Sequence, residues 1–273
     1  MIVVVAPAAR FHIIAAMKIR FIFPSIWAVT AMAVFFPLPD AAAQAVAIRV
    51  LVSNGMKAAM EQLQPQCERV IGHPLAMQFH STAAVKKQIE AGDQFDVTII
   101  TVEAIDDLAK EGKIAGESRA NVARSELGIG IRAGAPKPDI HTPEALKQTL
   151  RNAKSITYPE DGASRGYIEK MFESMGIAAE VKPRIILAQG SGPATESVAQ
   201  DKAAMVITLF SEIVPIPGVE VLGPLPWTFH YDIRFAAAVS TTTKNGDAAK
   251  ALIAFLAGTK VLPTLKAKGL ERF

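Results

Sequence analysis

Residues 75–92 read LAMQFHSTAAVKKQIEAG and combine three local signals. Leu75 to Phe79 is a short apolar run typical of a strand, and Thr82 to Glu90 has the spacing of an amphipathic helix that Gly92 ends. The corner between them, His80-Ser81-Thr82, places two hydroxyl groups at the start of the helix. The stretch therefore predicts one strand-to-helix unit of an α/β protein.

Units of the same kind recur along the chain. Further strands are predicted at residues 47–52, 96–100, 127–132, 155–158, 183–187, 204–208 and 234–239. Further helices are predicted at residues 57–63, 105–110, 166–175, 195–200, 248–257 and 261–268, and another starts at Thr142. Residues 215–226 are expected to form a loop, and the glycines of 127–132 to allow a bend or close backbone packing.

The alternation of strands and helices predicts an α/β fold with mostly parallel sheets flanked by helices. Two blocks of it, followed by a returning strand, predict two lobes with a ligand cleft between them. We expect lobe 1 to comprise residues 46–130 and 236–273, and lobe 2 to comprise residues 131–235.

The N-terminal 45 residues have the pattern of a secretory signal peptide. Lys18 and Arg20 precede an apolar run over 21–36, and small residues at 41–45 supply an Ala-x-Ala site. The alternative is a membrane anchor, but the run is shorter than the roughly 20 residues that a spanning helix needs. We therefore expect residues 1–45 to be removed, with Met17 as the true start, and the mature protein to be periplasmic.

Charge and cysteine content narrow the possible functions. Residues 1–45 carry +2 of the net charge of +3, which leaves +1 for the remaining 228 residues. This near-neutral balance disfavours nucleic-acid binding, which depends largely on phosphate neutralisation. Cys67 is the only cysteine, so no intrachain disulfide is possible. We expect a monomer without a cofactor.

Four predicted strand-to-helix corners carry hydroxyl or amide side chains beside small residues. The first turn of a helix has unpaired N–H donors and a partial positive charge, so corners that converge on one cleft could bind an anion. Arg165 could add a bidentate contact to a carboxylate or oxyanion. We expect neutral donors rather than acids around the ligand. The candidate ligand-binding residues are Ser53, Asn54, Gly55, Ser81, Thr82, Ala163, Ser164, Arg165, Gly190 and Ser191.

Other interpretations of these residues are weaker or purely structural. Each serine or threonine taken singly is most simply a helix cap. No His-Glu-x-x-His, Gly-x-Ser-x-Gly or Gly-x-x-x-x-Gly-Lys motif occurs, so no catalytic residue is predicted. The acidic pairs Asp106-Asp107 and Glu160-Asp161 could bind a metal, but a solvated helix face and a capped turn explain them better, so no residue is predicted as a direct metal ligand.

The chain resembles the periplasmic molybdate-binding proteins of ABC importers, which have the type II periplasmic-binding-protein fold. The resemblance covers nearly all of residues 48–273. It implies two lobes that close on a tetrahedral oxyanion such as molybdate or tungstate, and delivery to an ABC permease in the inner membrane. The strongest matches are Phe79-His80-Ser81-Thr82, Gln88-Ile89-Glu90-Ala91-Gly92 and Phe95-Asp96-Val97, and the looser ones are Tyr158 to Ser164 and Phe210-Ser211-Glu212.

Three departures from the family pattern leave the ligand open. Gly55 stands where the family has a serine, Leu209 stands where it has a tyrosine, and Arg165 adds a charge. The leading hypothesis is therefore an exported receptor for a molybdate-like oxyanion or, through Arg165, for a small organic carboxylate. The other hypotheses are a secreted hydrolase or transferase on a similar fold, and a sensory or colonisation-type binding protein.

Overall fold

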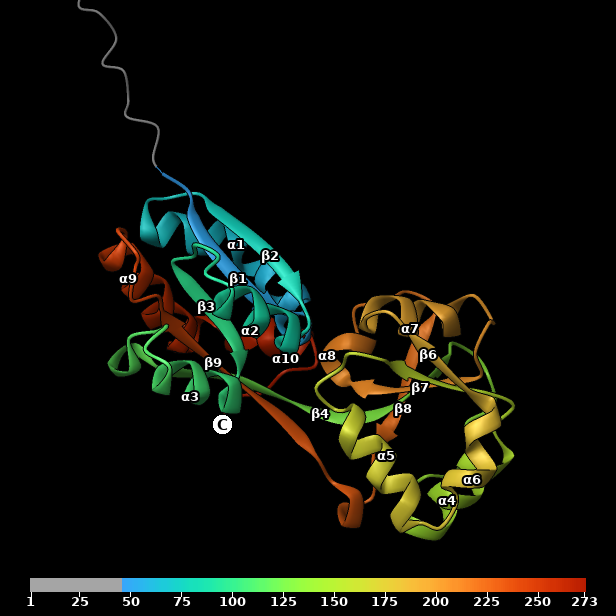
Figure 1. Cartoon of the computed structure of the whole chain (residues 1–273). Helices are drawn as coiled ribbons and strands as arrows, with labels where there is room; N and C mark the ends of the chain where they lie inside the picture. The colour runs from blue at the N-terminus through green and yellow to red at the C-terminus, as the bar shows by residue number, and fades with distance from the viewer. Residues whose placement is uncertain (1–45) are drawn as a thin grey trace, which may run out of the picture. The chain divides into compact units, whose positions relative to one another are not determined.

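The structure, a computed structural model, describes residues 46–273 (Figure 1), and the predicted signal peptide lies outside these residues. The strands are β1 (Ile48–Ser53), β2 (Leu75–His80), β3 (Val97–Thr101), β4 (Ala120–Arg132), β5 (Ile156–Pro159), β6 (Ile185–Ala188), β7 (Met205–Leu209), β8 (Val219–Pro224) and β9 (Asp232–Val239). The α-helices are α1 (Lys57–Ile71), α2 (Thr82–Glu90), α3 (Val102–Lys110), α4 (Pro143–Asn152), α5 (Arg165–Ser174), α6 (Ala178–Val181), α7 (Ser191–Ala199), α8 (Phe210–Ile213), α9 (Gly246–Ala257) and α10 (Leu262–Ala267).

The strands pair in the order β2-β1-β3-β9-β4-β7-β5-β6, and β8 also pairs with β4. Pairs among β1, β2 and β3 and among β5, β6 and β7 are parallel, whereas every pair that includes β4 or β9 is antiparallel. The first half of β4 pairs with β9, and its second half pairs with β7 and β8. The predicted two-lobed α/β fold is confirmed, while the exact lobe boundaries stay a prediction.

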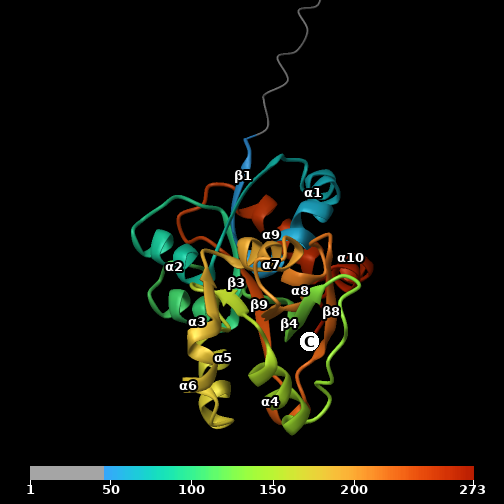
Figure 2. The same cartoon turned by 90° about the vertical axis from the view of Figure 1, so that its right-hand side faces the viewer.

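Strands of the first lobe bury both of their faces. Val50 and Val52 belong to one apolar cluster with α1 and α9, whereas Leu51 between them packs with α2 and α3. Figure 2 shows α2 and α3 on the opposite side of the strands from α1 and α9. Burial on both faces agrees with the burial of all five residues of β3, which are Val, Ile or Thr.

Two glycines in β4 allow close packing in the second lobe, as the sequence predicted. A Cβ atom on Gly128 would lie 2.1 Å from the ring of Phe210 in α8. A Cβ atom on Gly130 would lie 2.8 Å from Val206 in β7. The register with β8 also shifts between Ile129 and Gly130. These positions therefore exclude side chains because neighbouring elements approach the strand closely.

The segment 215–226 and helix α1 are among the elements that differ from the sequence prediction, as are β4, which begins earlier than predicted, and the unpredicted short helices α6 and α8. The expected loop at 215–226 contains β8, which pairs with β4 and supplies a further edge partner for it. Helix α1 continues past Pro65 to Ile71, although a proline inside a helix removes one hydrogen bond. Leu63 and Cys67 are fully buried on this helix, so tertiary packing outweighs the local penalty.

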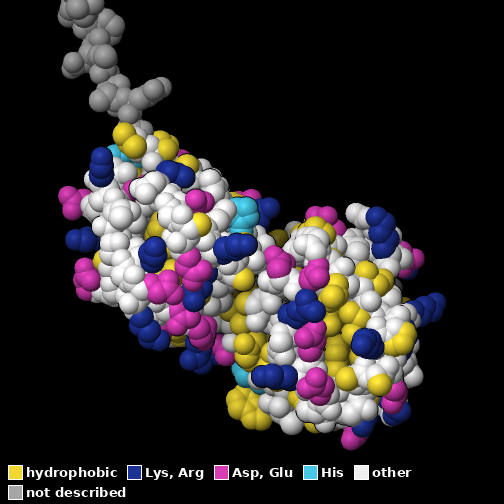
Figure 3. Space-filling model, in the orientation of Figure 1, with side chains coloured by type: hydrophobic (Ala, Val, Ile, Leu, Met, Phe, Trp, Pro, Cys, Tyr) yellow, Lys and Arg dark blue, Asp and Glu magenta, His cyan; other side chains and the backbone are white. Residues whose placement is uncertain are grey.

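Charged side chains of both signs are interspersed on the face of the molecule that Figure 3 shows.

No single helix within residues 46–273 is long and apolar enough to cross a membrane. The bent helix pair Gly246–Ala257 and Thr259–Ala267 reaches the required length and composition only when its two helices are taken together.

Ser125 of β4 connects three segments at the junction of the lobes. Its hydroxyl donates to the carbonyl oxygen of Gly269 at 2.9 Å and accepts the backbone N–H of Ser211 at 3.0 Å. A hydroxyl can donate and accept at the same time. Ser125 therefore links the start of α8 to the C-terminal segment that follows α10.

Asp96 holds the entrance of β3 in place. Its buried carboxylate accepts the backbone N–H of Arg49 at 2.8 Å, the side-chain amide of Asn245 at 3.0 Å, and the hydroxyl of Thr243. These donors come from β1 and from the loop after β9. The aspartate of the Phe95-Asp96-Val97 stretch is therefore a structural residue that ties three segments of the first lobe together.

We expect Asp96→Ala to lower the free energy of unfolding by about 3 kcal/mol, because three donors lose their acceptor in a buried site. For a domain of this size that corresponds to a fall in Tm of roughly 6–12 °C, measurable by thermal denaturation. Asp93→Ala, which removes an exposed carboxylate three residues earlier, is the control. Equal melting temperatures for the two variants would contradict this role of Asp96.

Candidate ligand-binding site

One cavity brings together residues from all four predicted corners. Its empty volume is about 350 Å³, including the mouth, and its walls come from both lobes. The enclosed part is narrow, with room for about one water molecule, so a larger ligand can enter only if the lobes move apart. The lining residues are Ser53, Asn54, Ser81, Thr82, Pro159, Asp161, Gly162, Ala163, Ser164, Ser191, Leu209, Glu212 and Phe235.

The two serine hydroxyls of the first lobe, Ser53 and Ser81, act as local acceptors and keep a donor for the cavity. Ser81 caps α2 by accepting the backbone N–H of Ala84 at 3.2 Å. Ser53 accepts the hydroxyl of Thr82 at 3.2 Å. Because each serine uses only its oxygen in these bonds, its own O–H remains able to donate. A capping role for Ser81 is thus compatible with contact to a ligand.

The second lobe contributes the first turns of α5 and α7. Ser164 directly precedes α5, is 3% exposed, and makes no side-chain capping bond. Ser191 is the first residue of α7 and is also buried. Ala163 lies in the loop before α5 and is exposed at the cavity wall. The unpaired N–H groups of two helix starts therefore lie on this side of the cavity.

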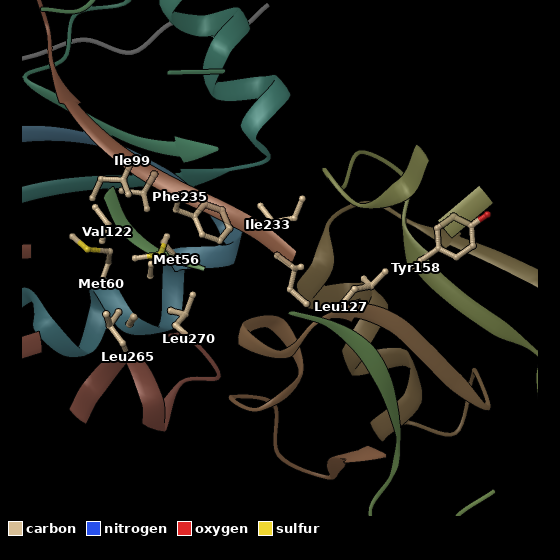
Figure 4. Packing of buried hydrophobic residues seen from close by; sticks show 14 of the residues in the cluster. Met56, Met60, Ile99, Val122, Leu127, Tyr158, Ile233, Phe235, Leu265 and Leu270 are labelled. Atoms are coloured by element: carbon tan, nitrogen blue, oxygen red, sulfur yellow. The ribbon is translucent and has the colours of Figure 1, made fainter. Parts of the chain in front are cut away.

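Two predicted glycines lie outside the cavity lining. A Cβ atom on Gly55 would lie 2.5 Å from the ring of Phe235 and 3.2 Å from Leu209, and both of these residues line the cavity. Figure 4 shows Phe235 beside Met56 in the core. A serine at position 55 cannot fit behind this wall, which explains why the hydroxyl comes from Ser53. Gly190 precedes α7 with a φ of +90° and lines a neighbouring groove instead.

The structure places Arg165 outside the cavity lining. Its guanidinium group bonds the Glu169 carboxylate at 2.9 Å and the carbonyl oxygen of Glu160 at 2.9 Å. It lines a different groove, together with Glu169 and Lys182, and is absent from the cavity lining. The reason is local: Glu169 lies one helical turn further along α5, so the two side chains form an i,i+4 ion pair.

Glu212 is a cavity residue that the sequence reasoning did not select. It lies in α8, just after β7, and lines both the cavity and the neighbouring groove. Removal of its carboxyl group from bulk solvent raises the pKa, while bonds from the hydroxyls of Thr208 and Ser191 and from the Leu209 N–H act in the opposite direction. The negative charge of Asp161 raises the pKa further. The balance is a pKa above the ordinary glutamate value.

The presence of Glu212 and Asp161 corrects the expectation that only neutral donors surround the ligand. Asp161 is exposed in the loop before α5, whereas Glu212 is more enclosed. The sequence signals for Glu212 were the loose family match of Phe210-Ser211-Glu212 and its place three residues after a strand end, where a glutamate is ordinarily a helix cap. Position in the chain cannot tell a cap on the surface from a carboxyl group that faces a cavity.

We expect the free energy of unfolding to depend on pH because the pKa of Glu212 is raised in the folded protein. Above pH 4.5, its ordinary value, the unfolded chain releases this proton while the folded protein retains it. The stability that the group contributes is present below that pH and is lost as the pH rises through the folded pKa. The glutamine of Glu212→Gln cannot ionise, so the Tm of this variant should rise relative to that of the wild type as the pH increases.

Differential scanning fluorimetry across pH 4 to 9 provides the measurement. Glu173→Gln, which removes an exposed carboxylate from the same lobe, is the control. A pH-independent Tm difference between Glu212→Gln and the wild type would show that the Glu212 carboxyl group ionises normally.

Both members of the acidic pair Asp106-Asp107 are engaged in ion pairs. Asp106 contacts Arg119 at 2.9 Å, and Asp107 contacts Lys86 at 3.0 Å. Within the described part of the chain, no group of three or more His, Cys, Asp or Glu side chains is arranged to hold a metal ion.

The two-lobed α/β fold with a cavity between the lobes is that of a type II periplasmic binding protein. The chain belongs to the family of bacterial extracellular solute-binding proteins, whose family model matches residues 48–271. Its resemblance to the molybdate-binding proteins, as a divergent relative, is also confirmed.

Three comparisons describe its relatives. An aconitate isomerase of Pseudomonas sp is 28% identical over 242 residues, which is 85% of this chain and 91% of that protein. The molybdate-binding protein ModA of Azotobacter vinelandii is 25% identical over 235 residues, 84% of this chain and 91% of the relative. The solved periplasmic molybdate-binding protein of Azotobacter vinelandii has a TM-score of 0.69 at 19% identity, with 82% of this chain and 98% of that chain covered. Because an isomerase stands among the binding proteins, the expectation of a non-enzyme stays a prediction.

Proposed function

We propose that the protein is an exported receptor that captures a small organic carboxylate between its two lobes. The carboxylate oxygens accept hydrogen bonds from the hydroxyls of Ser53, Ser81 and Ser164 and from the first-turn N–H groups of α2, α5 and α7. Asn54, Thr82, Ala163 and Ser191 complete the polar wall. The observation that carries this proposal is the mixed lining of one cavity, with donors at the helix starts and an apolar wall beside them.

The lining favours an organic acid over a tetrahedral oxyanion. An oxyanion such as molybdate carries negative oxygen atoms in every direction and needs donors all around it. Here Pro159, Leu209 and Phe235 present carbon, and Asp161 and Glu212 present carboxyl groups. A carboxylate concentrates its charge at one end, so its carbon skeleton can contact the apolar wall. The relationship to an aconitate isomerase, at 28% identity, supports the same choice.

Arg165 has no part in this binding, since its guanidinium group is held by Glu169 away from the cavity. The helix N–H groups and hydroxyls bind the ligand carboxylate in place of Arg165. An ABC permease is the proposed acceptor of the ligand, in keeping with membership of the extracellular solute-binding family. The signal-like pattern of residues 1–45 supports export to the periplasm.

A ligand panel tests the proposed substrate class. We expect citrate, tricarballylate or cis- and trans-aconitate to raise the Tm, because a ligand that binds only the folded state adds RT ln(1 + [L]/Kd) to its stability. At 100 times Kd this is about 2.7 kcal/mol, or roughly 5–10 °C. Molybdate, tungstate, sulfate and phosphate form the second arm of the thermal-shift panel. A rise with the tetrahedral oxyanions alone would overturn the proposal.

Substitution of the cavity serines tests the binding mode. Ser164→Ala and Ser81→Ala should each weaken binding of the carboxylate found in the panel by more than about tenfold, because a buried donor to a charged group is lost. Isothermal titration calorimetry gives the Kd. Ser174→Ala, at the far end of α5, is the control for Ser164→Ala.

Thr142→Ala is the control for Ser81→Ala. Thr142 caps α4 by accepting the N–H of Ala145 at 3.1 Å, just as Ser81 caps α2, but it lies outside the cavity lining. Both substitutions should cost about 1 kcal/mol of stability. Only Ser81→Ala should weaken binding. Unchanged binding in both cavity variants would reduce Ser81 and Ser164 to structural residues.

A further inference from the structure

Glu212 and Asp161 are the only ionisable side chains among the residues that line the cavity. The lining contains no histidine, cysteine, lysine, arginine or tyrosine. Any transfer of a proton between the protein and a ligand in this cavity therefore depends on one of two carboxyl groups. Asp161 is exposed in a loop, whereas Glu212 is enclosed and bonded by the hydroxyls of Thr208 and Ser191.

The cavity lining that contains Glu212 combines apolar side chains with hydroxyl donors. Leu209 precedes α8 and also lines the cavity, and Phe235 lines it from β9. The hydroxyl donors Ser53 and Ser81 belong to the other lobe. A ligand whose carboxylate is held by those donors would have its carbon atoms next to the apolar wall, where Glu212 is the nearby proton acceptor.

From this juxtaposition we infer that the protein also catalyses proton transfer at carbon: Glu212 moves a proton between two carbon atoms of a bound unsaturated polycarboxylate and so shifts its double bond. The inference rests on the proposed binding of an organic carboxylate. It adds an activity, an allylic isomerisation, to a fold whose ordinary task is capture of a solute.

The step balances without a cofactor. The Glu212 carboxylate accepts a proton from the methylene carbon that adjoins both the double bond and a carboxylate, and the C–H bond breaks. The electron pair left behind delocalises over the former double bond and its carboxylate group. Glu212, whose carboxyl proton can exchange with solvent during the step, then returns a proton to the far carbon, where a new C–H bond forms. One double bond has moved by one position, with no net gain or loss of protons or electrons.

The protein's groups suit both halves of this step. The hydroxyls and helix N–H groups that bind the ligand carboxylates also stabilise the negative charge that builds up on them. A raised pKa makes the Glu212 carboxylate a stronger base than an ordinary glutamate. The other charged residues in the two linings that contain Glu212 are Asp161 in the cavity and Lys57, Glu61 and Glu196 in the neighbouring groove.

Glu212 also has a structural role that the test must separate from catalysis. As the third residue of α8 it accepts the N–H of Leu209, which is the arrangement of a helix cap. Glutamine can accept the same bond, so Glu212→Gln keeps the cap and removes the base. Glu212→Asp keeps the carboxyl group but withdraws it by one methylene.

The experiment follows trans-aconitate with the mature protein in D2O by proton NMR. We expect the methylene signal to exchange and the cis isomer to form, at a rate that rises with pH as Glu212 ionises. Glu212→Gln should slow both by at least about 100-fold, the scale of a lost acid–base group, while its Kd for tricarballylate stays within about threefold. Glu173→Gln should react like the wild type.

Each outcome bears on a different claim. If carboxylates bind but the wild type gives no exchange, the catalytic inference is overturned and the receptor function stands. If no carboxylate binds, the proposed function fails first. Exchange that persists in Glu212→Gln would exclude Glu212 as the base. Should that variant not fold, a wild-type rate and pH profile in Glu212→Asp would overturn the inference in the same way.

Discussion

Enclosure of polar groups between the lobes is the constraint on which the site depends. A polar group removed from water must find a partner in the protein or in a ligand. Ser81 and Ser53 meet part of this demand with Ala84 and Thr82, and each keeps a hydroxyl donor. Glu212 meets it with hydroxyl groups and with a raised pKa that favours its neutral form. The hydroxyl donors of Ser53 and Ser81 remain available at the cavity, where a small anion would accept their hydrogen bonds.

The same arrangement couples binding to the position of the lobes. The donors of α2 belong to the first lobe, and those of α5 and α7 to the second, so the full set exists only when both lobes meet. Chain crossings at β4 and β9 connect the lobes, and Ser125 bonds the start of α8 to the segment after α10. Because Glu212 lies in α8, its distance from the first lobe depends on this junction.

Much of the fold and part of the site could be read from local patterns. A strand followed by a hydroxyl-bearing corner and a helix is a local signal, and seven of the ten candidate residues do lie on the cavity wall. The sequence pattern of an arginine in a glycine-rich corner did not show that Glu169 bonds the Arg165 guanidinium group outside the cavity lining. Strand β8 was predicted as a loop because the proline and glycine residues of this segment are typical of loops. Its pairing with the distant β4 is visible only in the structure.

The amino-acid sequence by itself determined the α/β class, the two lobes and the four polar corners that follow strands, because these follow from hydrophobic periodicity and capping within a few residues. Only the tertiary structure decided that Glu212 and Phe235 share a cavity with Ser53 and Ser81, which lie more than a hundred residues away. Whether a carboxyl group is solvated or enclosed depends on what distant segments place around it, and that is a property of packing rather than of neighbours in the chain.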